Sequence, residues 1–259
     1  MWCRGLPGLH ELSVGVRRSV PPQILLGFAR SPARRAYKAV VAGIRANQVL
    51  ESLSAYAVLY PALVAAERRG RYPLHASAVV AGDRAVVLLG LPGAGKATLS
   101  AALQTRGLAV PSDNLITVGA EGVWSVPEPV KLDARSHRLI GTDHSTSLAA
   151  TYGRSARPLS PPPGPLPVAA IVHLVAGATT QVATADDLSA ERLLDLNRLA
   201  YELHAYYHYR AFVRLALSGG GQPSELAVLG ALLTAAPAVT LTVGRDDVTQ
   251  ACAAVQDLV

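Results

Sequence analysis

The sequence predicts an α/β fold with a mixed, largely antiparallel central sheet, a phosphate-binding loop at a strand-to-helix junction, and a small N-terminal α+β portion. Residues 90–98 read Gly-Leu-Pro-Gly-Ala-Gly-Lys-Ala-Thr and lie between a strand-like apolar run at 85–89 and a helix-forming run. Residues 75–81 alternate as a strand does, and Gly82-Asp83 joins them to the next strand as a two-residue hairpin. The strand before the loop is therefore expected to have an antiparallel neighbour rather than a βαβ crossover.

The N-terminal portion is expected to cover residues 1–46, and a nucleotide-binding core to cover residues 47–259. In the N-terminal portion, residues 12–20 read as a strand and residues 32–46 as a basic helix. Between residues 48 and 69 apolar side chains recur at helical spacing, and Pro61 is expected to bend or divide that helix.

The elements after the loop alternate between helix and strand. The helix at 97–104 ends at Gly107, and a hairpin of residues 115–118 and 123–126 is joined by the four-residue loop Gly-Ala-Glu-Gly. The proline-rich run at 155–167 is expected to be an insertion or flexible loop, in preference to a recognition motif. The remaining predictions are a strand at 168–175, a long helix at 188–217, a helix at 225–235, a strand at 239–243 and a closing helix at 247–258.

Composition bounds the class of protein. The chain has 259 residues, half of them apolar, which is ample for a packed core. Its two cysteines, Cys3 and Cys252, lie at opposite ends of the sequence and indicate neither a disulfide framework nor a zinc ribbon. The N-terminus has no apolar signal core, and the apolar stretch at 226–243 reads as a buried helix and a strand. We therefore expect a cytoplasmic protein without a membrane span.

The net charge of +6 is unevenly distributed along the chain. Through Arg84 there are twelve basic and four acidic residues, so the basic excess precedes the loop. This excess could attract a nucleotide or an acidic leader peptide, but a solvated face is the simpler interpretation. Nucleic acid is disfavoured as a partner because no nucleic-acid motif or interleaved aromatic pattern accompanies the charge.

The loop at 90–98 matches the Walker A pattern except at one position. In that pattern glycines let backbone N–H groups surround phosphate oxygens, the lysine contacts the outer phosphates, and a Ser or Thr hydroxyl holds Mg²⁺. Ala97 stands where the hydroxyl belongs, so the metal ligand is absent while the phosphate cradle is present. The predicted nucleotide-binding residues are Gly90, Pro92, Gly93, Ala94, Gly95, Lys96, Ala97 and Thr98.

Three ordered elements resemble the catalytic core of HPr kinase/phosphorylase, which is related to phosphoenolpyruvate carboxykinase. They are Leu74-His75-Ala-Ser-Ala-Val, the loop itself, and Arg106-Gly107 followed by Ser112-Asp113-Asn114. The chain looks most similar to HPr-kinase-like proteins of bacterial peptide natural-product clusters. The resemblance implies an ATP-dependent kinase that uses Mg²⁺ and phosphorylates a hydroxyl of a peptide or small-molecule substrate in a bacterial biosynthetic pathway.

The resemblance also implies roles for individual residues. Asp113 matches the acid that acts on the acceptor hydroxyl, as base or metal ligand, although Ser112-Asp113-Asn114 also reads as an ordinary turn. Asn114 replaces a second acid and offers a metal only a neutral oxygen. His75 matches a histidine near the transferred phosphate, and Lys96 supplies the charge on the phosphates. Asp113, His75 and Lys96 are thus the candidate catalytic residues, with Asp113 and Asn114 as candidate metal ligands.

Two features stay open at this stage. His204 and His208 are four residues apart on a predicted helix, but no third ligand indicates zinc, and the tyrosines around them suit packing against another layer or a bound peptide. Because Ala97 and Asn114 alter the metal side together, the rival functions are a non-catalytic nucleotide- or peptide-binding protein and another group-transfer enzyme on the same core. The sequence leaves open the acceptor, the preferred nucleotide and a possible homo-oligomer.

Overall fold

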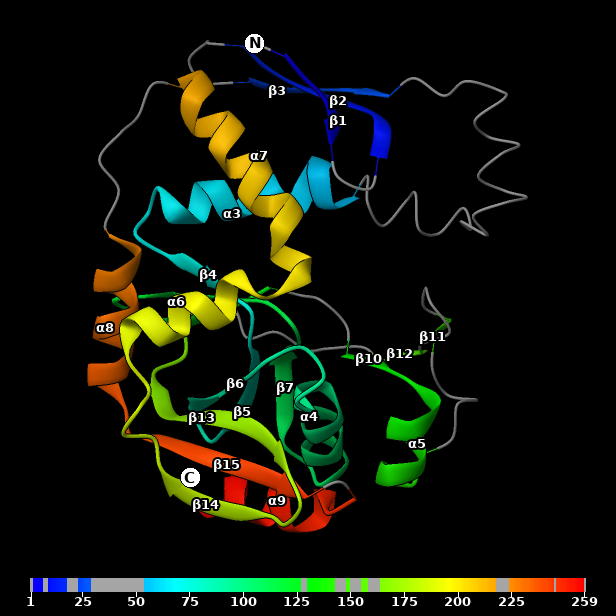
Figure 1. The fold of residues 1–259 in the computed structure, drawn as a ribbon, viewed down its shortest axis with the longest axis vertical. Coiled ribbons are helices and arrows are strands. Elements are labelled where there is room, and N and C mark those ends of the chain that lie inside the picture. Colours follow the sequence, from blue (N-terminus) through cyan, green and yellow to red (C-terminus); the bar gives the residue numbers. More distant parts are fainter. Residues whose placement is uncertain are drawn as a thin grey trace. The chain divides into compact units, whose positions relative to one another are not determined.

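A computed structural model describes residues 2–6, 9–17, 23–28, 54–126, 130–142, 148–149, 155–157, 164–217, 224–244 and 246–258 (Figure 1). Its contacts divide the chain into two units, which are described separately. Unit 1 comprises Met1–Arg68 and Glu202–Gln222, and unit 2 comprises Arg69–Tyr201 and Pro223–Val259. The domain division predicted at residue 46 stays a prediction, because residues 29–53 lie outside the described part of the chain.

Unit 1 contains a three-stranded antiparallel sheet in the order β1-β2-β3. Val14 and Val16 of the central strand are buried, as alternate residues on one face of a strand should be. The strand predicted at 12–20 corresponds to β2, whereas the helix predicted at 32–46 lies outside the described residues. The strands are β1 (Trp2–Leu6), β2 (Leu9–Arg17) and β3 (Gln23–Phe28).

The helices of unit 1 are held together by tyrosines. A π-helical turn, η1 (Ala55–Leu59), precedes α3 (Tyr60–Glu67), and Pro61 lies in the first turn of α3. Pro61 therefore divides the helix as predicted, because it cannot donate the next backbone hydrogen bond. On α7 (Tyr201–Leu217), Tyr206 and Tyr209 are fully buried, and their rings lie 5.6–6.1 Å from those of two tyrosines on η1 and α3, Tyr56 and Tyr60. These tyrosines thus serve packing within unit 1.

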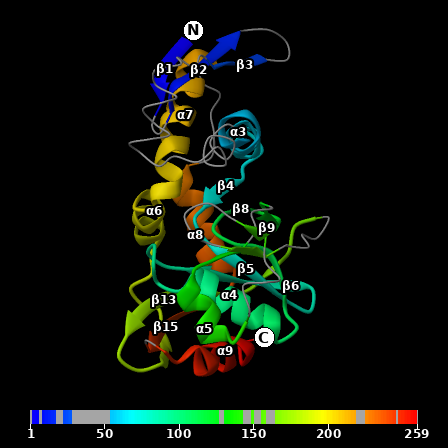
Figure 2. The same ribbon diagram turned by 90° about the vertical axis from the view of Figure 1, so that its right-hand side faces the viewer.

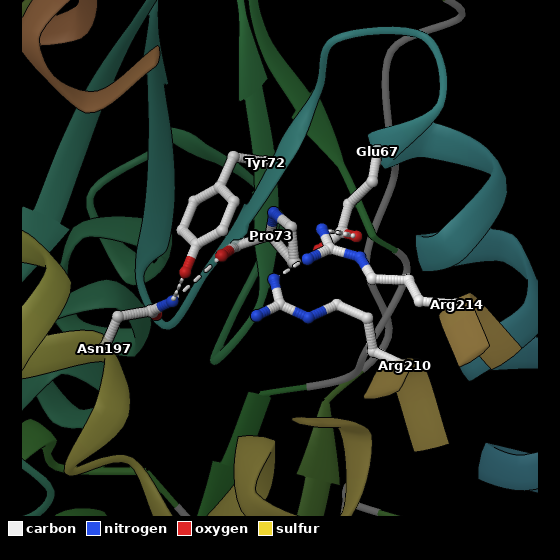
Figure 3. A network of polar contacts seen from close by, with 6 residues as sticks. All are labelled: Glu67, Tyr72, Pro73, Asn197, Arg210 and Arg214. Carbon is white, nitrogen blue, oxygen red and sulfur yellow. Dashed lines mark hydrogen bonds and ion pairs between the residues drawn. The ribbon is translucent and has the colours of Figure 1, made fainter. Parts of the chain in front are cut away.

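A buried carboxylate adds a polar contact between α3 and α7. The Glu67 side chain is 4% exposed and receives Arg210 Nη1 at 2.9 Å and Arg214 Nη2 at 3.0 Å, one on each oxygen (Figure 3). Both arginines lie on one face of α7 because they are four residues apart. Since each carboxylate oxygen has a cationic donor, the buried charge is compensated inside unit 1.

Unit 2 is built on a six-stranded sheet in the order β14-β15-β13-β6-β5-β7. The pairs β15/β13 and β13/β6 are parallel and the other three are antiparallel, which confirms a mixed, largely antiparallel sheet in an α/β fold. The antiparallel neighbour predicted for β6 is β5, but β6 also has a parallel neighbour, β13. The strands are β5 (Ser77–Ala81), β6 (Arg84–Leu89), β7 (Ala109–Ser112), β13 (Val168–Gly177), β14 (Gln181–Thr184) and β15 (Ala238–Gly244).

Helices cover both faces of this sheet, as the two views show (Figures 1 and 2). One face packs Val86 and Leu88 of β6 against α4 (Lys96–Thr105) and α9 (Val248–Gln256). The other face packs Val87 and Leu89 against α6 (Ala190–Arg198) and α8 (Glu225–Ala235). Because successive strand residues point to opposite faces, one apolar strand contributes to both cores.

Two local predictions were wrong. The long helix expected at 188–217 is two helices, since α6 ends at Arg198 with a tight turn in which Ala200 N–H bonds Asn197 O at 3.3 Å. The division between the units falls in this region, and apolar periodicity does not register it. The hairpin loop has two residues rather than four, because Gly119 pairs with Gly122. Gly122 has φ of +117°, which permits that tight reversal.

Shorter elements complete unit 2. No helix in the described ranges is both long enough and apolar enough to cross a bilayer. Of the proline-rich run, residues 158–163 lie outside the described part, whereas Leu166 makes a bridge to Val123. The remaining elements are β4 (Tyr72–Leu74), β8 (Ile116–Gly119) and β9 (Gly122–Ser125) in one small sheet, β10 (Val130–Leu132), β11 (Leu148–Ala149) and β12 (Ser155–Arg157) in another, and α5 (Ala134–Ile140).

Candidate functional site

The phosphate-binding loop occupies the junction between β6 and α4. Its glycines Gly90, Gly93 and Gly95 have φ values of +148°, +85° and +97°. A Cβ atom on Gly90 would lie 2.6 Å from the carbonyl oxygen of Leu174 on β13, so only glycine fits there without a shift. Leu99 N–H bonds Gly95 O at 2.9 Å as α4 begins. The loop thus leads into a helix N-terminus, where unpaired N–H groups favour an anion.

Lys96 lies directly over this loop. Its side chain is buried, at 7% exposed, and Nζ donates to Gly90 O at 2.8 Å and to Leu91 O at 3.3 Å. The ammonium group therefore sits beside the loop backbone, at the first residue of α4. A phosphate bound in the cradle would exchange these carbonyl contacts for ion pairs with phosphate oxygens, in which both partners are charged.

The sheet topology brings Asp113 and His75 to the same edge as the loop. Strands β6 and β7 both pair antiparallel with β5, so their carboxyl ends lie beside the amino end of β5. The loop follows β6, Asp113 follows β7, and His75 precedes β5 by two residues. The candidate catalytic residues therefore come from three adjacent strands of unit 2 and gather at one edge of its sheet.

The Asp113 side chain is 3% exposed and accepts a hydrogen bond from the Ser77 hydroxyl, with 2.5 Å between Oγ and Oδ1. The turn that follows is fixed by its neighbours. Ser112 Oγ donates to Val126 O at 2.6 Å and also bonds Leu115 O, while Asn114 has φ of +77°, a left-handed conformation that asparagine tolerates. The turn and the buried carboxylate are thus both present, and the Ser112 side chain bonds the local backbone.

His75 is held through its backbone by a residue that the sequence analysis missed. Asn197 of α6 is 1% exposed, and its Oδ1 accepts the His75 N–H at 2.6 Å. Its Nδ2 donates to Pro73 O at 3.0 Å and to the Tyr72 hydroxyl at 3.4 Å (Figure 3). One amide therefore fixes the segment from Tyr72 to His75, which leads into the site.

The residues present fit a phosphate better than a loop-side metal. Ala97 offers no oxygen, and Thr98 Oγ1 lies 2.8 Å from Ser136 Oγ of α5, so its hydroxyl is directed at α5. Asp113 and Asn114 offer oxygens on the far strand, but no group of three or more His, Cys, Asp or Glu side chains that could hold a metal occurs among the described residues. The catalytic roles considered below therefore belong to the residues of the chain.

A second histidine, His173, was not predicted to belong to the site. It pairs with Leu89, the last residue of β6, and its side chain is 7% exposed. Burial lowers the pKa of His173, opposed by the negative charge of Asp187 and reinforced by Arg192. Its Nδ1 atom is buried without a hydrogen-bond partner within the described part of the chain. In the sequence, His173 could have been noticed as a polar residue within the otherwise apolar strand predicted at 168–175.

The two histidines of the predicted long helix lie in the other unit. His204 and His208 are exposed on α7, in unit 1, and no described metal-binding group includes them. Zinc therefore gains no support from the described residues.

The comparisons with known proteins give a weak result. A scan against models of protein families found no match, and a sequence search of curated proteins also found none. Among solved structures, the Hpr(Ser) kinase/phosphatase from Coxiella burnetii matches with a TM-score of 0.24 and 14% sequence identity. That match covers 57% of this chain and 99% of the other.

Proposed function

We propose that the protein is an ATP-dependent kinase that transfers a phosphoryl group to a hydroxyl of a peptide or small molecule. The observation that carries this proposal is the placement of a phosphate-binding loop and a buried carboxylate at the same edge of one sheet. A phosphoryl transfer needs a cradle, a positive charge and a base, and little other covalent chemistry from the protein.

Each of these parts has a candidate in the chain. The backbone from Gly90 to Thr98 is the cradle, and Lys96 is the charge. When bound, ATP supplies the phosphoryl group. Asp113 accepts the proton of the acceptor hydroxyl, and His75, which precedes β5 by two residues, is the candidate contact to the phosphate or the acceptor. A Mg²⁺ ion would take the side-chain oxygen of Asn114, because Ala97 lacks the usual hydroxyl.

The proposed acceptor and cellular location follow from the sequence. The sequence resemblance favours a peptide or small-molecule acceptor in a bacterial biosynthetic pathway, inside the cytoplasm. An acidic peptide segment would suit the basic N-terminal half of the chain. A homo-oligomer is compatible with these roles.

The test replaces Asp113 by asparagine and follows both binding and transfer. ATP affinity is measured by calorimetry, and transfer is measured by mass spectrometry of serine- and threonine-containing peptides incubated with ATP. We expect Asp113→Asn to slow transfer by about a hundredfold or more while nucleotide affinity changes little, since the base acts on the acceptor. His75→Ala is expected to be milder. An equal loss of binding and transfer in Asp113→Asn would contradict the role of base.

The second candidate function is a non-catalytic nucleotide-binding protein with the same core. It is favoured by the joint loss of the hydroxyl at Ala97 and of the second carboxylate at Asn114. This candidate predicts that ATP binds equally well with and without Mg²⁺ and that no acceptor gains phosphate. The kinase predicts metal-dependent binding and a phosphorylated product.

A further inference from the structure

The carboxylate of Asp113 accepts a hydrogen bond from Ser77, a residue to which no role has been given above. Ser77 is the first residue of β5, and its hydroxyl donates to Asp113 Oδ1 at 2.5 Å. Ser77 is 0% exposed and Asp113 3% exposed, so both ends of this bond are shielded from water. A hydroxyl that donates to a carboxylate forms a stronger hydrogen bond when the carboxylate is ionised than when it is neutral.

The strand register brings Ser77 and Asp113 together. Ala78 of β5 pairs with Ser112, the last residue of β7, and Asp113 follows Ser112 while Ser77 precedes Ala78. Continued by one position, this antiparallel register sets Ser77 opposite Asp113, and opposite residues point to the same face of a sheet. That face is the one covered by α4, because Val79, two residues after Ser77, packs in the core shared with Leu99. The pair therefore lies beneath the helix that begins with Lys96.

We propose that Ser77 is a positioning residue for Asp113, an inference that rests on the proposed kinase function. Its hydroxyl holds one carboxylate oxygen at a fixed place and thereby sets the plane of the group that must meet the acceptor hydroxyl. Ser77 thus acts through Asp113 and not on the substrate.

The proton balance follows from this arrangement. As the acceptor oxygen bonds to the transferred phosphorus, its proton moves to Asp113, and the bond between that phosphorus and the leaving diphosphate breaks. Ser77 keeps its own proton and forms no bond to phosphorus. Because its side chain is fully buried, Ser77 is not an acceptor itself. Phosphate found on Ser77 by mass spectrometry would overturn the positioning role.

The test compares three single variants of the full chain. Ser77→Ala removes the donor. Ser77→Thr retains the hydroxyl and adds one methyl group; threonine is favourable in β-strands, although an added methyl group in a packed core costs some stability. The matched control is Ser100→Ala. Ser100, on α4, is also 0% exposed, but its hydroxyl has no hydrogen-bond partner among the described residues. Removing that hydroxyl leaves no partner unsatisfied.

We expect Ser77→Ala to lower kcat by about tenfold to about a hundredfold, because a small misplacement of a reacting group has effects of that size. The KM for ATP should stay unchanged, since the cradle is untouched. Ser77→Thr should recover most of the rate, and Ser100→Ala should match the wild type. A Ser77→Ala protein with an unchanged kcat, or one in which kcat falls only together with ATP affinity, would overturn the proposal.

A readout without activity separates this proposal from the kinase assignment. The Asp113 carboxyl carbon is observed by ¹³C NMR at one fixed pH and identified by its absence in Asp113→Asn. Its chemical shift should change in Ser77→Ala and not in Ser100→Ala, and an unchanged chemical shift would show that Ser77 does not hold Asp113. A wild type without transfer but with the expected change in Ser77→Ala would refute the kinase and leave the contact intact. If Ser77→Ala does not fold, Ser77→Cys serves the same measurement, because a thiol is similar in size and a weak donor.

Discussion

Asn197 offers a quantitative test of how the fold positions the candidate site. Replacing it by leucine keeps a side chain of similar length but removes both polar ends. The His75 N–H and the Pro73 carbonyl, which Asn197 contacts at 2.6 Å and 3.0 Å, would lose their partner in a buried place. An unsatisfied buried group costs about 1–3 kcal/mol, so the two together predict a loss of about 2–6 kcal/mol in the free energy of unfolding of unit 2. The 3.4 Å contact to the Tyr72 hydroxyl adds little.

The assay uses the two tryptophans of the chain, Trp2 and Trp124, which fall in different units. In a Trp2→Phe background, Trp124 fluorescence during urea unfolding reports on unit 2 alone. The control is Arg198→Gln on the same helix, which removes an exposed ion pair with Asp195 and should cost less than about 1 kcal/mol. An Asn197→Leu variant as stable as this control would refute the claim that Asn197 fixes the segment before β5.

Three further predictions concern charge and metal. Glu67→Gln should destabilise unit 1 by about 3–5 kcal/mol, because it leaves the 13%-exposed Arg210 without its charged partner. Arg214→Gln should cost about 1 kcal/mol, since that arginine is 41% exposed. Thermal unfolding followed by Trp2 in a Trp124→Phe background measures both variants, and equal effects would contradict the burial argument. Burial lowers the pKa of His173 in the folded state. The neutral imidazole therefore contributes its full stability to unit 2 above about pH 6.5, and this contribution is lost as the pH falls through the lower folded-state pKa. The free energy of urea unfolding should differ less between pH 7.5 and 5.5 in His173→Leu than in the wild type, and an equal difference in both proteins would contradict this prediction. Ala97→Ser together with Asn114→Asp should tighten Mg²⁺-dependent ATP binding in calorimetry and raise any transfer rate, whereas a fall in activity would show a site rebuilt around the alanine and asparagine.

The sequence was sufficient where local chemistry decides the structure. The glycines of the loop, the Gly82-Asp83 turn and the apolar run at 85–89 each indicate their conformation within a few residues, and all three are present in the structure as predicted. The two-residue loop at Ala120-Glu121 was predicted two residues too long, because Gly119 and Gly122 continue the strand pairing.

What the sequence did not indicate depends on contacts between distant residues. The bond from Asn197 to His75 spans 122 positions, and the bond from Ser77 to Asp113 spans 36. Neither residue type stands out locally, because a serine in a strand and an asparagine near a helix end are both common. Only the register of β5 with β7 and the packing of α6 in unit 2 bring these pairs together. The break between α6 and α7 was missed for a different reason, because apolar periodicity does not register the tight turn in which Ala200 N–H bonds Asn197 O.

The central claim is that Lys96 and its loop hold the phosphates of a nucleotide for transfer. Its most direct test is calorimetric binding of ATP to the wild type and to Lys96→Ala, with Lys131→Ala as the matched lysine control on β10. Because a charge-assisted hydrogen bond contributes about 1.5–3 kcal/mol, Lys96→Ala should weaken ATP binding by about tenfold to about a hundredfold and abolish transfer in a protein whose circular dichroism spectrum is unchanged. Lys131→Ala should bind as the wild type does. Equal ATP affinity and transfer in Lys96→Ala and the wild type would contradict the assignment of this loop as the nucleotide site.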